Sequence, residues 1–336
     1  MKEKKQYQLS VDMFKMICAI LVIAIHTAPL IEISPFSNYL IVQVLGRLAV
    51  PSFFGLASYY FYKKYQVAES KKKYLLSYCK RMGLLYLFAS IIYLPIWIYA
   101  HPTFSIVELM KDILLDGFHY HLWYFPALIV GTVIVCLLEK YVPKKTGTIV
   151  IILFLIGSFM NVYFPFFKGL TGMEQLPIEF SRNGVFFAPV FIYCGFHIKK
   201  IVPKERHLLI VGIAYLLECL VLHGTNNYTS VTSMYLTLLL IIPILLQWII
   251  NGGKTVHSNQ QLHSLSTYLY ILHPMVILLI QKVYSINQMN IPNILLFLLT
   301  VIGTILLSFV IQFLLSFVQQ TLFSKKQFAM KKVEIE

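Results

Sequence analysis

Three basic side chains lie within long apolar segments of the sequence: His26, Arg47 and His273. An imidazole can accept and return a proton near neutral pH, and a guanidinium can bind a carboxylate, a phosphate or an acyl carbonyl oxygen. At about 1.5 Å per helical residue, the three side chains could meet near the middle of a membrane-spanning bundle. Ionisable groups are costly at that depth, so each of them indicates a functional site by default.

The first apolar segment carries further polar groups on the face of His26. Lys15 and His26 are eleven residues apart, which is three helical turns, and Asp12 lies nearly one turn before Lys15. One face therefore carries a carboxylate and an ammonium at one end and an imidazole deeper in. The alternative interpretation is an interfacial ion pair between Asp12 and Lys15, with the lysine stem along apolar surface. The imidazole of His26 suits proton transfer, because its unperturbed pKa lies near neutrality.

Arg47 lies roughly 12 Å below the outer end of the second apolar segment. A guanidinium at that depth cannot easily reach water and needs partners within the protein. It would suit an acyl carbonyl, a phosphate or a carboxylate of a substrate. The alternative is a structural pair with a carboxylate of another helix, for which the candidates are Glu218 and Asp116.

The entry to the fourth apolar segment contains two histidines, His119 and His121, followed by Trp123 and Tyr124. An aromatic belt at the membrane surface explains the two aromatic residues but not the histidines. A zinc site with Asp116 as third ligand is one alternative, although two spaced histidines are a weak pattern. We favour an outer entrance that binds a polar acceptor.

The segment around His273 continues with Pro274, which kinks a helix and frees backbone carbonyls. A kinked helix with a hydrogen-bonded histidine is therefore the alternative to a functional His273. The remaining histidines lie in loops or at helix ends and are interpreted as solvated: His101, His197, His207, His223, His257 and His263. The sequence lacks the GxxxxGK[ST], HExxH and GxSxG patterns, so ATP-driven pumping and soluble-type hydrolase chemistry have no support.

The elements that must position these side chains are membrane-spanning helices. Of 336 residues, 58% are hydrophobic and 12% charged, whereas about a quarter of a soluble domain is charged. This composition excludes a cytosolic enzyme, a disordered chain and a nucleic-acid-binding domain. Ten segments approach the roughly 20 apolar residues that a span needs: 13–33, 39–62, 82–100, 122–139, 147–166, 185–198, 208–223, 232–250, 264–283 and 294–322. We predict an all-α polytopic membrane protein with about ten transmembrane helices, forming a single domain over residues 1–336.

The net charge of +14 comes mostly from basic residues between the apolar segments. Of 28 lysines and arginines, 22 fall in the predicted inner segments and three in the outer loops. This asymmetry predicts that both termini are cytoplasmic. The longest inner segment, 63–81, would face anionic lipid or an anionic cytosolic ligand. The five cysteines have no CxxC spacing and are interpreted as reduced packing residues, neither disulfide-bonded nor zinc-binding.

In their order and spacing, these residues resemble the acyltransferase family 3 of integral membrane proteins. The matching motifs are Asp12, Lys15-x10-His26, Arg47-x3-Pro51-Ser52-Phe53-Phe54, Lys80-Arg81, His121-Leu122-Trp123-Tyr124 and Tyr270-Ile271-Leu272-His273-Pro274. The family usually has Arg at the position of Lys15 and a second Arg at the position of Leu84. These departures resemble the branch that includes the membrane domain of vancomycin-resistance serine racemases.

The resemblance implies a multi-pass enzyme of the bacterial plasma membrane. Such an enzyme carries an acyl group, often acetyl, from cytoplasmic acyl-CoA to a hydroxyl of an envelope sugar, polymer or lipid. His26 would act as the base or acyl carrier, and Arg47 would hold the oxyanion or orient the acceptor. The other expected contacts are Lys15, Lys80 and Arg81 for the CoA phosphates, and His121, Trp123, Tyr124 and His273 for the acceptor. Acyl-CoA is a substrate here, so we expect no tightly bound cofactor, no metal and no nucleic-acid partner.

Two other functions remain open at this point. The same buried polar residues could serve a secondary transporter of a small polar solute, such as an amino acid. The lack of a strong CoA motif favours the transporter, whereas the lack of an internal inverted repeat speaks against it. A membrane scaffold that binds a partner is the third hypothesis, and it leaves His26 and Arg47 unexplained.

Overall fold

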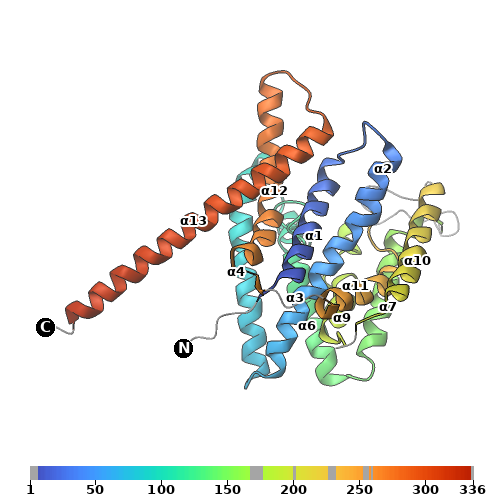
Figure 1. Cartoon of the computed structure of the whole chain (residues 1–336), viewed down its shortest axis with the longest axis horizontal. Coiled ribbons are helices and arrows are strands. Elements are labelled where there is room, and N and C mark those ends of the chain that lie inside the picture. The colour runs from blue at the N-terminus through green and yellow to red at the C-terminus, as the bar shows by residue number, and fades with distance from the viewer. Residues whose placement is uncertain are drawn as a thin grey trace. The chain divides into compact units, whose positions relative to one another are not determined.

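The computed structural model describes residues 7–166, 177–199, 202–225, 232–252, 257–258 and 260–333, without the side chains of residues 7, 257–260 and 318–333. Most of these residues are helical (Figure 1). The longer helices are α1 (Leu9–Thr27), α3 (Ala49–Gln66), α4 (Lys71–Ala100), α6 (Tyr124–Tyr141), α7 (Thr146–Asn161), α10 (Glu205–Gly224), α11 (Leu238–Gly252), α12 (Gln260–Ile286) and α13 (Asn293–Val333). The shorter elements are α2 (Pro35–Tyr39), α5 (Ile106–Lys111), α9 (Ala188–Phe196), the π-helices η1 (Leu40–Leu45) and η3 (Asp112–Asp116), the 3-10 helices η2 (Gly46–Leu48) and η4 (Ile178–Phe180), and the strands β1 (Tyr7–Gln8) and β2 (His257–Ser258). The prediction of an all-α fold is confirmed, since the two strands have only two residues each.

Seven helical stretches of the described chain are long and apolar enough to cross a membrane: Leu9–Thr27, Pro35–Gln66, Lys71–Ala100, Tyr124–Tyr141, Glu205–Gly224, Gln261–Ile286 and Asn293–Phe317. Two shorter apolar helices are α7 and α11. With α9, each of the ten predicted segments contains a helix. The chain is therefore a polytopic membrane protein, while the number of spans and the side of the termini stay predictions.

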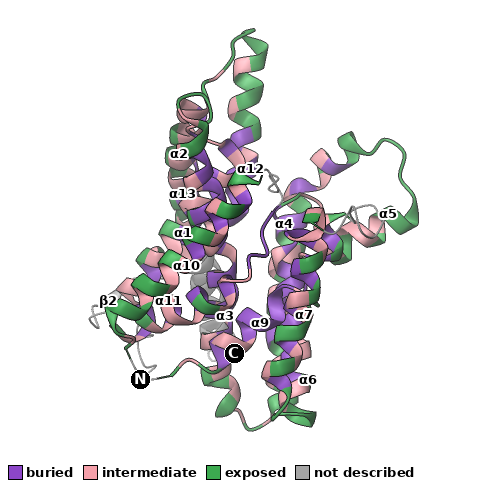
Figure 2. Ribbon diagram, turned by 90° about the vertical axis from the view of Figure 1, so that its right-hand side faces the viewer, coloured by how far each residue is buried: buried purple, intermediate pink, exposed green. Residues whose placement is uncertain are grey.

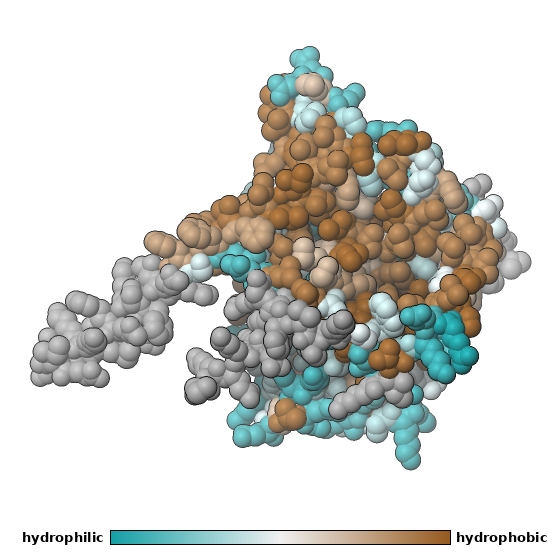
Figure 3. All heavy atoms as spheres, viewed as in Figure 1, coloured by the Kyte–Doolittle hydropathy of each residue, from teal (hydrophilic) through white to brown (hydrophobic). Residues whose placement is uncertain are grey.

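The helices carry many large apolar side chains on their outer surfaces. Leu87 and Ile91 of α4 and Leu209 and Leu217 of α10 are more than half exposed. Apolar side chains cover most of the face shown in Figure 3, and hydrophilic side chains gather toward its upper and lower ends. A soluble protein rarely exposes so large an apolar surface. The surface instead suits contact with lipid chains.

The chain divides into two compact units, of which the first comprises Met1–Pro35 and Thr255–Glu336. In this unit α1 and α13 both pack against α12. The strands β1 and β2, which precede α1 and α12, pair with each other, and the two helices then run in the same direction (Figure 1). On α13, Gly303 lies against Val276 of α12, where an added Cβ would come within 3.2 Å of a methyl group. Small residues at this position let the two helices approach closely.

The second unit comprises Phe36–Lys254 and is built around the short helix α9. α9 packs against α3, α6, α7 and α11 and is buried over most of its length (Figure 2). Its closest contact is with α3, because a Cβ at Gly195 would lie 2.3 Å from the carbonyl oxygen of Gly55. Only a glycine allows the two backbones to lie so close. α9 thus acts as the central packing element of this unit.

Two predicted boundaries differ from the structure for physical reasons. The first helix ends at Thr27 rather than at residue 33, because Ala28 adopts a left-handed conformation (φ 45°) before Pro29. A residue that precedes proline is disfavoured in the α-helical conformation. The inner segment 63–81 is not a loop: α3 extends to Gln66 and α4 begins at Lys71. Hydropathy predicts which part of a helix lies in lipid, but a helix can continue beyond that part as long as its backbone hydrogen bonds do.

Candidate functional site

A buried polar cluster joins the beginnings of α1 and α12 in the first unit. Asp12 is 1% exposed, and its Oδ1 accepts hydrogen bonds from Lys15 Nζ at 3.0 Å and from His263 Nδ1 at 2.8 Å. Lys15 Nζ also donates to the backbone oxygen of His263 at 3.2 Å. Asp12 lies in the first turn of α1, where the helix dipole favours a carboxylate. The predicted ion pair of Asp12 and Lys15 is confirmed, and His263 is an additional partner that belongs to another helix.

Further along the same two helices, His26 of α1 stacks on His273 of α12. The ring centroids are 5.4 Å apart and the ring planes differ by 19°. His26 is partly exposed in the last turn of α1, whereas His273 is fully buried. The prediction that Lys15 and His26 share one face of the first helix is confirmed, because both residues contact α12. The structure thus brings His26 and His273 together within the first unit.

Arg47 lies in the second unit, 7% exposed, where the chain passes from η1 through η2 into α3. Its Nε donates to Oε1 of Gln43, one turn earlier, at 2.9 Å. Three tyrosines, Tyr39, Tyr215 and Tyr235, lie close enough to act on the guanidinium electrostatically. Short π-helical segments such as η1 are frequent at functional sites. The surroundings of Arg47 are therefore polar and aromatic.

The carboxylate of Glu218 has a structural role in the second unit. It accepts hydrogen bonds from the hydroxyl of Tyr163, from the backbone amides of Leu236 (2.7 Å) and Thr237 (2.9 Å), and from the Thr237 hydroxyl. A carboxylate has about four acceptor positions, and these donors fill them. Glu218 therefore ties α10 to the segment before α11, which speaks against its predicted alternative role as the partner of Arg47.

The two histidines before α6, His119 and His121, contact each other. His119 Nδ1 and His121 Nδ1 are 3.2 Å apart, so one ring donates a hydrogen bond to the other. Burial lowers the pKa of His119 to about 4. Asp116, the third ligand of the alternative zinc site, pairs with Lys111 at 3.5 Å. Among the described residues, no group of three His, Cys, Asp or Glu side chains is arranged to hold a metal ion.

The aromatic residues that follow are packed into the second unit. Trp123 is 6% exposed, and the guanidinium of Arg182 lies 4.8 Å from the centre of its ring. Tyr124 packs on Phe54 of α3, with the ring centroids 4.7 Å apart. Gly117 makes this arrangement possible, because its φ of 78° turns the chain and a Cβ there would lie 2.5 Å from Leu122. The position of the Arg182 guanidinium over the Trp123 ring is a cation–π contact.

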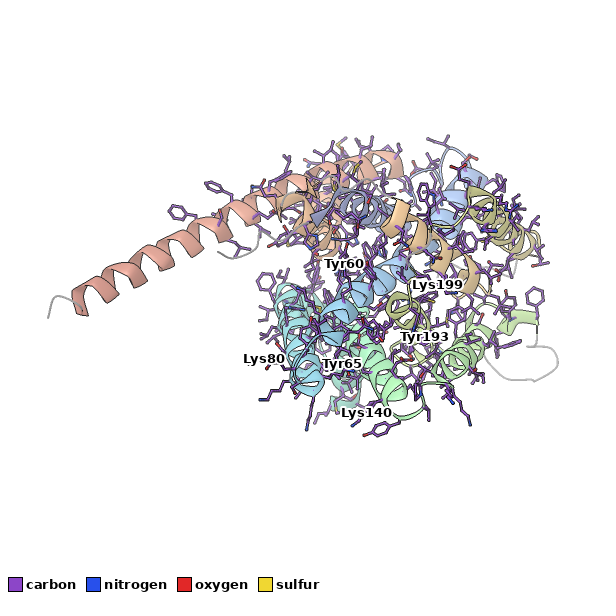
Figure 4. The ribbon with its side chains drawn as sticks, turned by 60° about the horizontal axis from the view of Figure 1, so that its bottom comes forward. Tyr60, Tyr65, Lys80, Lys140, Tyr193 and Lys199 are labelled. Atoms are coloured by element: carbon purple, nitrogen blue, oxygen red, sulfur yellow. The ribbon has the colours of Figure 1, made fainter. Side chains whose placement is uncertain are left out.

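One end of the second unit combines lysines with tyrosines, which we call the tyrosine–lysine end. Figure 4 looks toward this end and shows Tyr65, Lys80, Lys140 and Tyr193, which come from α3, α4, α6 and α9. Three cations lie over tyrosine rings: Lys63 over Tyr59 at 5.4 Å, Lys71 over Tyr65 at 5.6 Å, and Arg81 over Tyr78 at 5.5 Å. Lys80 and Arg81 are exposed on α4 rather than in a loop before it. The arrangement offers positive charge and flat rings to an anionic ligand.

Several side chains of these clusters were not expected from the sequence. His263 and His223 are not simply solvated: the first binds Asp12, and the ring of the second lies 4.3 Å from that of Tyr39. Gln43 lies four residues before Arg47, a spacing that would have indicated a contact within one helix. His257 lies where no side chain is described. All five cysteines are free, as predicted.

The fold and the polar clusters define a polytopic helical membrane protein that keeps ionisable groups, His273 and Arg47, in its interior. Within that class, the acyltransferase domain family matches residues 8–313, and the chain belongs to this family. No solved structure matches the chain. The resemblance that the sequence motifs predicted is thus confirmed at the level of the family.

Similar proteins among the curated relatives are racemases of enterococci. The chain is 34% identical over 329 residues to a serine/alanine racemase of Enterococcus gallinarum, which covers 88% of this chain and 45% of the relative. It is 30% identical over 330 residues to an amino-acid racemase of Enterococcus faecalis, which covers 89% of this chain and 45% of the relative. The chain therefore spans less than half the length of these relatives. The predicted resemblance to a racemase branch of the family is confirmed.

Proposed function

We propose that this protein is a multi-pass O-acyltransferase of the plasma membrane. It would move an acyl group, most simply acetyl, from cytoplasmic acyl-CoA to a hydroxyl of an envelope sugar, polymer or lipid outside. The observation that carries the proposal is the position of His26, at the end of α1 and against His273, in a chain of the acyltransferase domain family. The orientation follows from the distribution of lysine and arginine.

His26 acts as the general base in this reaction. The acceptor hydroxyl gives its proton to the imidazole while its oxygen attacks the carbonyl carbon of the thioester. The carbon–sulfur bond then breaks, and the departing CoA sulfur takes the proton back from His26. The last turn of α1 favours the imidazolium that forms in between, because the C-terminal end of a helix carries partial negative charge.

Arg47 holds the oxyanion that develops on the thioester oxygen, or it orients the acceptor. A guanidinium in a dry, preorganised setting stabilises such a charge far better than water does. The hydrogen bond from Arg47 Nε to Gln43 supports this role, because it fixes the plane of the guanidinium group. If the role is correct, Arg47→Lys should lower kcat, since an ammonium lacks the planar geometry.

The CoA phosphates bind near Lys80 and Arg81. Both side chains are exposed at the tyrosine–lysine end, and the guanidinium of Arg81 rests over the ring of the buried Tyr78. Lys15, the third expected contact, already donates to Asp12 and to the backbone of His263. We therefore expect a smaller contribution to donor binding from Lys15 than from Lys80 and Arg81.

The acceptor binds near His121, Trp123 and Tyr124 at the opposite side of the membrane. Tyr124 is partly exposed, so its ring could pack on a sugar, whereas the buried Trp123 would position Arg182 as a hydrogen-bond donor. His121 is 2% exposed and contacts His119. It would therefore form part of the wall of the acceptor entrance.

The test is release of CoA from labelled acetyl-CoA by purified protein in liposomes, with envelope extract outside. We expect His26→Ala to lose at least about 100-fold in turnover, as removal of a general base does. His207→Ala is the matched control, because His207 is exposed on α10. All variants must elute as folded protein. Turnover that survives in folded His26→Ala would overturn the assignment.

A second candidate function is secondary transport of a small polar solute, such as an amino acid. The names of the relatives favour it, since they are a serine/alanine racemase and amino-acid racemases that are about twice as long as the matched region. A membrane region next to a racemase could supply its substrate. Uptake of labelled serine into liposomes without acyl-CoA, together with no CoA release from any acyl-CoA, would establish this alternative.

A further inference from the structure

The contact between His26 and His273 has a defined chemical form. His273 Nδ1 lies 3.0 Å from the carbonyl oxygen of Leu269, one turn earlier in α12. A carbonyl can only accept a hydrogen bond, so Nδ1 of His273 must carry a proton. In the neutral ring, Nε2 then carries none. The ring is therefore held in one tautomer and one orientation by its own helix.

The pair is also held in register along the two helices. Asp12 and Lys15 join α1 to His263 at the beginning of α12, and His26 meets His273 further along. Two polar contacts at separate levels resist sliding of one helix along the other. His273, which is fully buried, therefore presents a flat surface at a fixed position beside His26.

The charge of the pair is limited by its geometry. Two positive charges on rings whose centroids are 5.4 Å apart would repel each other, so the pair does not readily carry a second proton. Of the two rings, His273 is fully buried and only His26 is partly exposed. A proton taken up by the pair therefore resides on the partly exposed ring, His26.

We propose that His273 is a positioning residue for His26 and not a substrate contact. This inference rests on the acyltransferase function proposed above. His273 stays neutral, with its Nδ1–H bound to the carbonyl oxygen of Leu269. Its ring holds the His26 imidazole in one orientation. In that orientation His26 takes the proton from the hydroxyl of the acyl acceptor. When the CoA sulfur departs, the proton passes from His26 to that sulfur, and His273 neither gains nor loses one.

Two substitutions of His273 separate the positioning role from a substrate contact. His273→Phe keeps a flat, neutral ring against His26 but removes both ring nitrogens. His273→Leu has a similar apolar character without a flat surface. We expect His273→Phe to keep most of the turnover, and His273→Leu to lose about 100-fold in kcat with little change in either KM, as misplacement of a catalytic group does. His207→Leu on α10 is the control for loss of a histidine.

The assay also distinguishes this inference from the function on which it rests. If the wild type releases no CoA, the acyltransferase function fails and the role of His273 fails with it. If the wild type is active but both variants raise KM for the acceptor equally, His273 contacts substrate and only the inference fails. As a measurement independent of variants, 15N NMR of histidine-labelled wild type should show His273 protonated at Nδ1 and bare at Nε2. A bare Nδ1 would contradict the inference.

Discussion

Asp12 and His263 are 251 residues apart in the chain, yet His263 Nδ1 donates a hydrogen bond to Asp12 Oδ1 across 2.8 Å. This contact joins the first turns of α1 and α12 at a point where Asp12 is almost completely buried. Lys15 adds its charge to the same carboxylate oxygen. The Asp12 carboxylate thus binds two basic side chains and links α1 to α12.

Replacing Asp12 by Asn should destabilise the protein strongly. The substitution removes the negative charge but leaves the largely buried ammonium of Lys15 in place. Removal of one partner of a buried ion pair costs about 3–5 kcal/mol, because the other charge is left uncompensated. We expect a lower midpoint in thermal unfolding of the detergent-solubilised protein.

The double variant Asp12→Asn/Lys15→Met tests the physical reason. It removes both charges, so it should be more stable than Asp12→Asn alone. Glu32→Gln is the matched control, since Glu32 is exposed and accepts a hydrogen bond from the backbone amide of Asn293 at 3.2 Å. If Asp12→Asn and Glu32→Gln had equal effects, the buried pair would have no special role.

Replacing Glu218 by Gln should loosen the link between α10 and the segment before α11. A glutamine has one acceptor oxygen, and its amide nitrogen would face donors that Glu218 now accepts from. Leaving such donors unsatisfied costs about 1–3 kcal/mol. Glu205→Gln, in the exposed first turn of α10, is the control and should change the unfolding midpoint little.

Much of the fold follows from hydropathy alone. Each apolar segment contains a helix, because a chain in lipid must satisfy its own backbone hydrogen bonds. The ends are less predictable: α1 stops before Ala28, whose left-handed conformation precedes Pro29, and α4 begins eleven residues before the apolar segment does. Lysine, leucine and arginine, which are frequent in residues 71–81, form helices readily, so a change in composition at residue 82 does not mark a helix boundary.

The site was predictable only where it depends on one helix. The helical period places Lys15 and His26 on one face, and the spacing of Gln43 and Arg47 would have indicated their hydrogen bond. Which helix packs against α1 is decided by tertiary packing, so His263 could not be assigned to Asp12 beforehand. For the same reason, the sequence around Arg47 does not indicate that Tyr215 and Tyr235 lie close to it.

Replacing Gly195 by Ala should disrupt the contact between α9 and α3. The added Cβ would meet the carbonyl oxygen of Gly55 at 2.3 Å, and backbone atoms there cannot move aside as a flexible side chain can. Overpacking of this kind costs about 1–3 kcal/mol. Gly212→Ala on α10 is the control, because nothing lies within 4 Å of a Cβ at that position. We expect Gly212→Ala to be neutral or to stabilise, since alanine is the better helix former.

His119 should make the stability of the protein depend on pH. Its pKa is lowered by burial to about 4 in the folded protein, whereas an unfolded histidine titrates near about 6.5. Between these values the unfolded state binds the additional proton, so the folded state loses stability as pH falls from about 6.5 to 4. Above that range His119 is neutral in both states and contributes no pH dependence.

His119→Gln should therefore flatten the fall in unfolding midpoint between pH 7 and pH 4.5. A glutamine can still donate to His121, so the hydrogen bond that joins the two side chains is retained while the titrating group is lost. The measurement is a series of thermal unfolding curves of wild type and variant in the same detergent. If both proteins lose stability equally over this range, other groups carry the pH dependence, and the burial of a neutral His119 is not what limits stability in acid.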